Sequence, residues 1–121
     1  RVLAASETDA VYTRLFDVGW PDAPHRTLRN ATLERWEAAG GPPSGRRPGE
    51  GDTVARLPDG TAVPRYSEIP PLPGMTGDLA ALVHYAGQSA GLVTRVQPAG
   101  AIVRELVEET RRTLDARRLA E

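Results

Sequence analysis

The feature that most constrains this chain is a helical spacing of apolar residues over positions 76–93, which two glycines interrupt. The apolar residues follow the period of one buried helix face: Leu79, Leu82, Val83, Ala86, Ala90 and Val93. Gly87 and Gly91 lie one turn apart, and each destabilises a helix interior by about 1 kcal/mol relative to alanine. The glycines indicate close approach of a ligand to the backbone, tight packing against another helix, or a helix that ends at Gly87. The polar neighbours Tyr85, Gln88 and Ser89 suit the first explanation.

The N-terminal third predicts a helix end, a strand, a turn and a short helix, in that order. Positions 1–6 read as the last turns of a helix. Positions 10–17 alternate and are rich in β-forming residues, which predicts a strand, and the prolines of positions 19–24 predict a turn. Asn30 can cap a helix that continues to Ala39, where Gly40 and Gly41 end it.

The middle of the chain predicts a loop followed by a hairpin. Positions 40–50 have no periodicity, and we expect Arg46 and Arg47 in this loop to be solvated rather than to bind phosphate. Two short strands flank the turn sequence of positions 58–60, where Pro58 fixes φ and Gly60 accepts a positive φ. Pro64 confines the second strand to the edge of a sheet.

The C-terminal segment predicts a surface helix over positions 98–114, with Pro98 at its first position. Its apolar stripe must cover something apolar, and it consists of Ile102, Val103, Leu106, Thr110 and Leu114. We find no catalytic group in this helix.

Composition excludes several chemistries. The chain has no cysteine, which removes disulfides, thiolate nucleophiles and Cys-ligated metals, and its 15 basic residues are all arginine, which removes Schiff-base lysines. The formal net charge of −1 gives no field that attracts nucleic acid, and no apolar run approaches the length of a membrane span. We therefore expect no nucleic-acid partner, no membrane partner and a cytoplasmic location. Because the chain starts at Arg1 without methionine, we also expect it to be a piece of a longer polypeptide.

The titratable residues do not assemble a complete active site. His25 and His84 are the only histidines, and neither has a second ligand at metal-binding spacing, so the sequence predicts no metal site and no catalytic residue. The turn from Tyr85 to Ser89 is the only candidate that could face a ligand.

Three strings in the chain resemble the C-terminal part of nitronate monooxygenases, the FMN-dependent enzymes once called 2-nitropropane dioxygenases. They are Thr-Arg-Leu-Phe-Asp at 13–17, Trp-Pro-Asp-Ala-Pro-His-Arg-Thr-Leu-Arg-Asn at 20–30, and Tyr-Ala-Gly-Gln-Ser-Ala-Gly-Leu at 85–92. The resemblance extends from Leu3 to about Glu109 and keeps the order of the elements. The third string also resembles one in flavin-dependent enoyl-ACP reductases.

The resemblance implies an α/β fold: an incomplete C-terminal portion of an FMN-binding (β/α)8 TIM barrel with its added α+β substrate domain. Positions 1–75 would belong to the added domain, and positions 76–121 would return to the barrel and close it. The family's flavin-contact turn corresponds to Tyr85, Ala86, Gly87 and Gln88, so these four residues are the expected FMN contacts.

The reaction implied for the larger enzyme is oxidation of an alkyl nitronate with O2 to a carbonyl compound and nitrite. The phosphate-binding strand ends and the catalytic base of the family have no counterpart in this sequence, so we expect the chain alone to be inactive. Two alternatives stay open, namely part of an enoyl-ACP-reductase-like flavoenzyme and a small non-catalytic module whose helices dock onto a partner.

Overall fold

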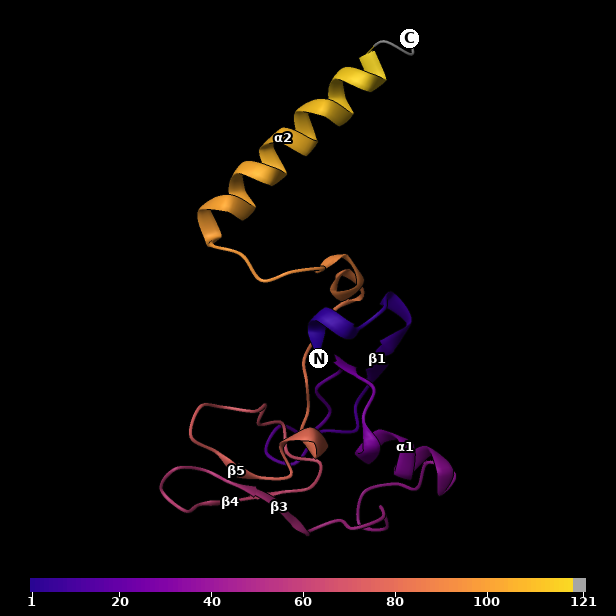
Figure 1. The fold of residues 1–121 in the computed structure, drawn as a ribbon. Helices are drawn as coiled ribbons and strands as arrows, with labels where there is room; N and C mark the ends of the chain where they lie inside the picture. Colours follow the sequence, from indigo (N-terminus) through magenta and orange to yellow (C-terminus); the bar gives the residue numbers. More distant parts are fainter. Residues whose placement is uncertain (119–121) are drawn as a thin grey trace.

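The computed structural model describes residues 1–118 as a small α/β domain with two sheets, from which a long C-terminal helix projects (Figure 1). The strands are β1 (Ala10–Thr13), β2 (His25–Leu28), β3 (Thr53–Arg56), β4 (Ala62–Pro64) and β5 (Thr76–Gly77). The helices are α1 (Ala31–Ala38) and α2 (Ala99–Arg118), with short 3-10 turns at Val2–Ala4, Glu7–Asp9, Leu79–Ala81 and Gln88–Leu92. None of the helices within 1–118 is long and apolar enough to cross a membrane.

The first sheet is the antiparallel pair of β1 and β2, in which Ala10 faces Leu28 and Thr13 faces His25. The strand expected over 10–17 is therefore confirmed, but it ends at Thr13. The Thr13 hydroxyl accepts a hydrogen bond of 3.0 Å from the Leu15 N–H, and this bond turns the chain away from the sheet. The following turn, expected from the prolines at 19–24, is also present.

Helix α1 is confirmed together with both of its ends. The Asn30 side chain accepts a hydrogen bond of 3.0 Å from the Leu33 N–H, as an N-cap residue does. Gly40 and Gly41 follow the helix with φ of +80° and +67°, a conformation that only glycine adopts at little cost. The helix thus begins and ends where the sequence predicted.

The second sheet has the strand order β4-β3-β5, and its hairpin is confirmed. The Leu57 N–H donates to the Thr61 carbonyl at 2.9 Å across the turn, in which Gly60 has a φ of +87°. Pro64 ends the edge strand β4, as its missing N–H requires.

The helix predicted over 76–93 is wrong. Strand β5, two 3-10 turns and an extended segment replace it. Two side chains at the start of α1 donate hydrogen bonds to backbone carbonyls of this segment. Asn30 Nδ2 donates to the Leu82 carbonyl at 2.8 Å, and Thr32 Oγ1 donates to the Ala81 carbonyl at 2.9 Å. An α-helix would need those carbonyls for its own hydrogen bonds.

Burial explains why the extended form is favoured here. Leu82 packs with Val54, Val63 and Met75 beside the second sheet, in one buried cluster. Its neighbour Val83 belongs to a second buried cluster with four other residues: Leu15, Phe16, Leu33 and Tyr66. Successive side chains of an extended chain point to opposite sides, so one segment fills both clusters. The division of the chain at residue 75 stays a prediction about a larger protein.

Helix α2 is confirmed and runs four residues beyond its expected end at Leu114. The Pro98 carbonyl accepts hydrogen bonds from the Ala101 and Ile102 N–H groups, so Pro98 precedes the helix rather than forming its first turn. No residue of 99–118 is buried, and the predicted apolar stripe is exposed. The (β/α)8 barrel expected around this helix stays a prediction.

Candidate functional site

The expected flavin-contact residues form an extended segment along β2. The Leu28 N–H donates to the His84 carbonyl at 2.9 Å, and the Ala86 N–H donates to the Arg26 carbonyl at 3.2 Å. Thr27 and Tyr85 form an isolated antiparallel bridge. This pairing holds residues 84–86 firmly and leaves Gly87 and Gln88 exposed at the point where the chain departs from β2.

Tyr85 is the most strongly positioned of the four residues. Its hydroxyl donates to the Glu68 carbonyl at 2.9 Å, and its ring stands edge-to-face with His25 at 5.5 Å between ring centres. Partial burial, with a smaller effect of the Glu68 carboxylate, raises the pKa of the hydroxyl above its usual value. Tyr85 therefore stays neutral near pH 7 and acts as a hydrogen-bonding and stacking group.

The two glycines of this region have different surroundings. A Cβ at Gly91 would lie 2.8 Å from the Glu7 backbone nitrogen, so Gly91 is required by packing against the N-terminal segment. A Cβ at Gly87 would meet only Ser89 Oγ, at an ordinary 3.7 Å, and Gly87 has a φ of −81°. Tight packing thus explains Gly91, whereas nothing within residues 1–118 requires glycine at position 87.

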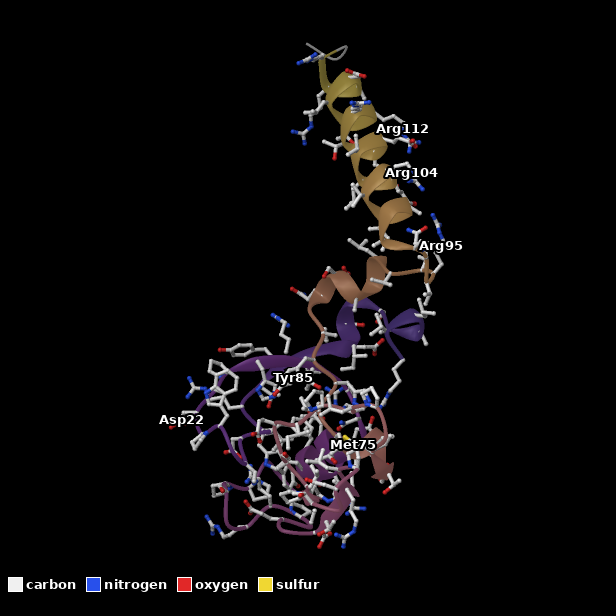
Figure 2. The ribbon with its side chains drawn as sticks, turned by 90° about the vertical axis from the view of Figure 1, so that its left-hand side faces the viewer. Asp22, Met75, Tyr85, Arg95, Arg104 and Arg112 are labelled. Carbon is white, nitrogen blue, oxygen red and sulfur yellow. The ribbon has the colours of Figure 1, made fainter. Side chains whose placement is uncertain are left out.

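A cleft of about 310 Å³ adjoins Tyr85, and the sequence reasoning missed it. The outer edge of the domain bears Asp22, with Tyr85 further in (Figure 2). The wall is almost entirely aromatic and proline-rich, and it is formed by Phe16, Trp20, Pro21, Asp22, Ala23, Pro24, His25 and Tyr85. The signal in the sequence was a tryptophan between a glycine and a proline, in a segment that we predicted only as a turn.

His25 occupies the inner side of this cleft. Its Nδ1 lies 3.0 Å from the Ala23 carbonyl, and because a carbonyl only accepts, Nδ1 carries the proton of the neutral ring. Its Nε2 then bears a lone pair. That nitrogen is buried and has no hydrogen-bond partner among residues 1–118.

The second histidine is also held in one tautomer. His84 Nδ1 lies 2.8 Å from the Leu82 carbonyl, and burial lowers the pKa of this histidine below its usual value. The two histidines therefore bond to different parts of the backbone, His25 to Ala23 and His84 to Leu82. Residues 1–118 contain no group of three or more side chains that could hold a metal ion.

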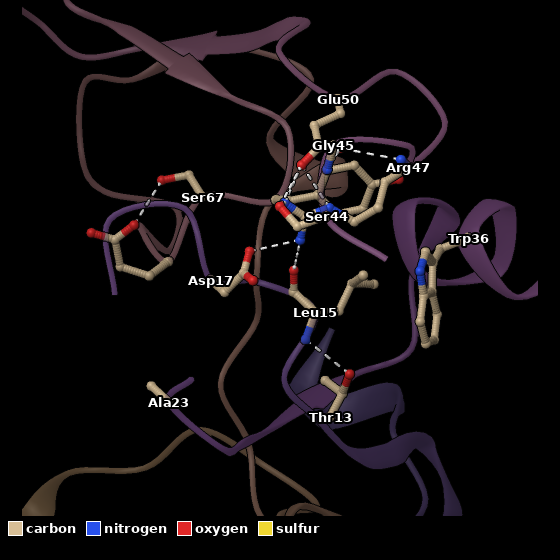
Figure 3. Close-up of polar contacts among 12 residues, drawn as sticks. Thr13, Leu15, Asp17, Ala23, Trp36, Ser44, Gly45, Arg47, Glu50 and Ser67 are labelled. Atoms are coloured by element: carbon tan, nitrogen blue, oxygen red, sulfur yellow. Dashed lines mark hydrogen bonds and ion pairs between the residues drawn. The ribbon is translucent and has the colours of Figure 1, made fainter. Parts of the chain in front are cut away.

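The expectation that Arg47 is solvated is wrong. Its side chain is only 4% exposed, and it ion-pairs with Asp17 at 2.6 Å and with Glu50 (Figure 3). It also donates to the Leu15 carbonyl at 3.0 Å. Arg46 is exposed, as expected. Arg47 is committed to internal partners, and the expectation that the pair does not bind phosphate stays a prediction.

Comparison of the chain with models of known families, with curated proteins and with solved structures finds no match.

Proposed function

We propose that this chain is the C-terminal part of an FMN-dependent nitronate monooxygenase, in which Tyr85, Ala86, Gly87 and Gln88 contact the flavin. The observation that supports this proposal most is Gly87. It is an exposed glycine with open space at its Cβ position, next to a segment that β2 holds in place. A backbone of this kind lets a flat cofactor approach closely.

Three of the four residues offer groups that suit an FMN contact. Tyr85 offers an aromatic ring, Gly87 an open backbone and Gln88 an exposed amide that can donate or accept. The bound FMN would supply the redox chemistry, with O2 as the oxidant and an alkyl nitronate as the substrate. The role of the chain in that reaction is to bind the cofactor and cover it, and the base lies outside this sequence.

Helix α2 is consistent with a covering role. Its apolar stripe is exposed, with Val103 60% and Leu106 58% accessible, as expected for an outer helix that packs on a barrel. The same exposure favours the alternative of a non-catalytic module that docks through α2. An enoyl-ACP-reductase-like flavoenzyme is the other alternative, because it shares the Tyr-Ala-Gly-Gln string. We place the larger enzyme in the cytoplasm.

The first experiment is to read the DNA upstream of the codon for Arg1. An open frame encoding about 200 further residues, the scale of a barrel, is expected for the enzyme. A start codon directly before Arg1 would favour the docking module.

The second experiment tests Gly87 in that longer protein. We expect Gly87→Val to lower flavin content and nitronate-dependent O2 uptake strongly, with native circular dichroism. Gly87→Ala is the matched control, and it should keep the flavin. Full flavin content and activity in Gly87→Val would refute the contact, and NAD(P)H-dependent bleaching with an enoyl substrate would favour the reductase.

A further inference from the structure

We propose that the cleft beside β2 binds a small, flat, uncharged molecule that carries one N–H or O–H donor, with the ring on Trp20 and the donor on His25. This inference goes beyond the proposed function, because it rests on the cleft alone and needs no flavin. The probe we choose is 4-methylphenol.

The lining of the cleft selects an apolar ring. Trp20 is 64% exposed and Tyr85 44% exposed, so both present ring surface to solvent, whereas Phe16 is buried behind them. Aromatic rings that line a concave surface bind flat apolar molecules by stacking and by burial of area. The volume of about 310 Å³ is at the small end of ligand sites and suits one or two rings.

The loop that carries Trp20 is held in shape before any ligand binds. Gly19 has a φ of +102° and Asp22 a φ of +57°. The loop also contains two prolines, at positions 21 and 24. The backbone N–H of Trp20 donates to the Asp17 carbonyl at 3.1 Å. A loop fixed in this way loses little conformational entropy on binding, which favours affinity.

The hydrogen-bond preference comes from His25. With Nδ1 donating to the Ala23 carbonyl, Nε2 is an acceptor, and it is a buried one with no partner among residues 1–118. A buried unpaired acceptor is energetically costly, so a ligand that donates to it recovers a hydrogen bond that the protein alone does not make. Because Nε2 is buried and the Tyr85 ring packs edge-to-face on His25, binding of the donor requires the Tyr85 ring to move, and the Tyr85 amide reports that movement.

The test is an NMR titration of the isotope-labelled chain with 4-methylphenol and, separately, with 4-methylanisole, which has the same ring but no donor. The two tryptophan indoles give separate N–H signals. Trp36 is the internal reference, because its indole N–H donates to the Pro42 carbonyl at 2.8 Å. We expect the Trp20 indole and the amides of Gly19, Ala23 and Tyr85 to shift, and the Trp36 indole to stay.

We expect 4-methylphenol to bind about threefold to tenfold more tightly than 4-methylanisole, the effect of one hydrogen bond. Trp20→Ala should weaken 4-methylphenol by about fivefold. Tyr12→Ala, which removes an equally exposed ring on β1 outside the cleft, should leave the affinity unchanged. His25→Phe should make the two probes equal, because it keeps a ring and removes the acceptor.

Equal affinity of the unaltered chain for the two probes would overturn the role of His25. Shifts confined to α2, or no effect of Trp20→Ala, would overturn the site itself. Because Trp20 is exposed, its replacement does not threaten folding, and retained dispersion of the Trp36 indole signal verifies this in each variant.

Discussion

The guanidinium carbon of Arg47 lies 4.5 Å from the centre of the Tyr66 ring, and this stacked pair closes the long loop between α1 and β3. Tyr66 has a φ of +69°, which is unfavourable for a bulky residue, and it is only 1% exposed. Its hydroxyl donates to the Pro48 carbonyl at 2.9 Å. A region without regular secondary structure is thus held in place by one buried cation, its two carboxylates and one strained aromatic residue.

Replacing Arg47 should therefore destabilise the fold. We expect Arg47→Ala to lower the free energy of unfolding by roughly 3 kcal/mol, because it leaves Asp17 and Glu50 without their cation. Urea unfolding followed by circular dichroism measures the change. Arg46→Ala is the matched control at the adjacent exposed position and should change stability by less than about 0.5 kcal/mol. Equal effects of the two variants would show that the Arg47 cluster does not stabilise the fold.

Glu50 should make stability depend on acid. Hydrogen bonds from Arg47 hold the pKa of the Glu50 carboxyl at about 2, below its usual 4.5. A carboxyl whose pKa is lower in the folded state stabilises the fold above its unfolded pKa, and that stabilisation is lost as the pH falls. We expect urea midpoints to fall between about pH 4.5 and pH 2, and to fall less in Glu50→Gln. Parallel acid profiles for the two proteins would contradict this assignment.

The Asn30 side chain both caps α1 and holds Leu82, which is extended, through its carbonyl. We expect Asn30→Ala to cost about 2–3 kcal/mol, because it removes the cap and leaves the buried Leu82 carbonyl unpaired. Asn30→Asp keeps the cap acceptor but loses the donor to Leu82. If Asn30→Asp were as stable as the unaltered chain in thermal unfolding, the hydrogen bond to the Leu82 carbonyl would not contribute to stability.

These contacts show which parts of the fold could be predicted from the sequence. The cap at Asn30, the glycines after Ala39 and the hairpin turn at Pro58–Gly60 act within a few residues, so local reasoning finds them. The non-helical form of 76–93 depends on Asn30 and Thr32, about 50 positions away, and on two buried clusters that the chain must fill at once. Helical spacing alone could not reveal that. The burial of Arg47 was missed because it depends on Leu15 and Asp17, which lie 32 and 30 positions away, as well as on the nearby Glu50. The Trp20 cleft was missed because Tyr85, which lines it together with positions 16–25, is distant in sequence.

Gly91 and Gly87 offer a direct test of what each glycine does. A Cβ at Gly91 would collide with the Glu7 backbone, so we expect Gly91→Ala to destabilise the contact of Gln88–Leu92 with the N-terminal segment. Gly87→Ala has open space and an accessible φ, and it should stabilise the chain by about 0.4–1 kcal/mol. Hydrogen exchange at the Asp9 amide, which donates to the Ser6 carbonyl, reports the first effect, and the melting temperature reports the second. Unchanged exchange in Gly91→Ala would contradict the predicted clash.

The exposed stripe of α2 should make the chain self-associate when it is studied alone. Exposed apolar faces tend to become interfaces. The four aliphatic side chains of the stripe, Ile102, Val103, Leu106 and Leu114, are each at least 42% accessible, and the neighbouring Val107 is 44% accessible. Analytical ultracentrifugation should show a weight-average mass that rises with concentration, and binding of an apolar dye should rise with it.

Val103→Glu combined with Leu106→Glu should abolish both effects. The double variant should keep the unfolding transition of residues 1–93, because no residue of α2 is buried in that domain. Arg104→Glu is the matched control, since it changes charge on the same helix without removing an apolar side chain, and it should still associate. If the unaltered chain stayed monomeric at all concentrations, the prediction that the stripe drives self-association would be wrong.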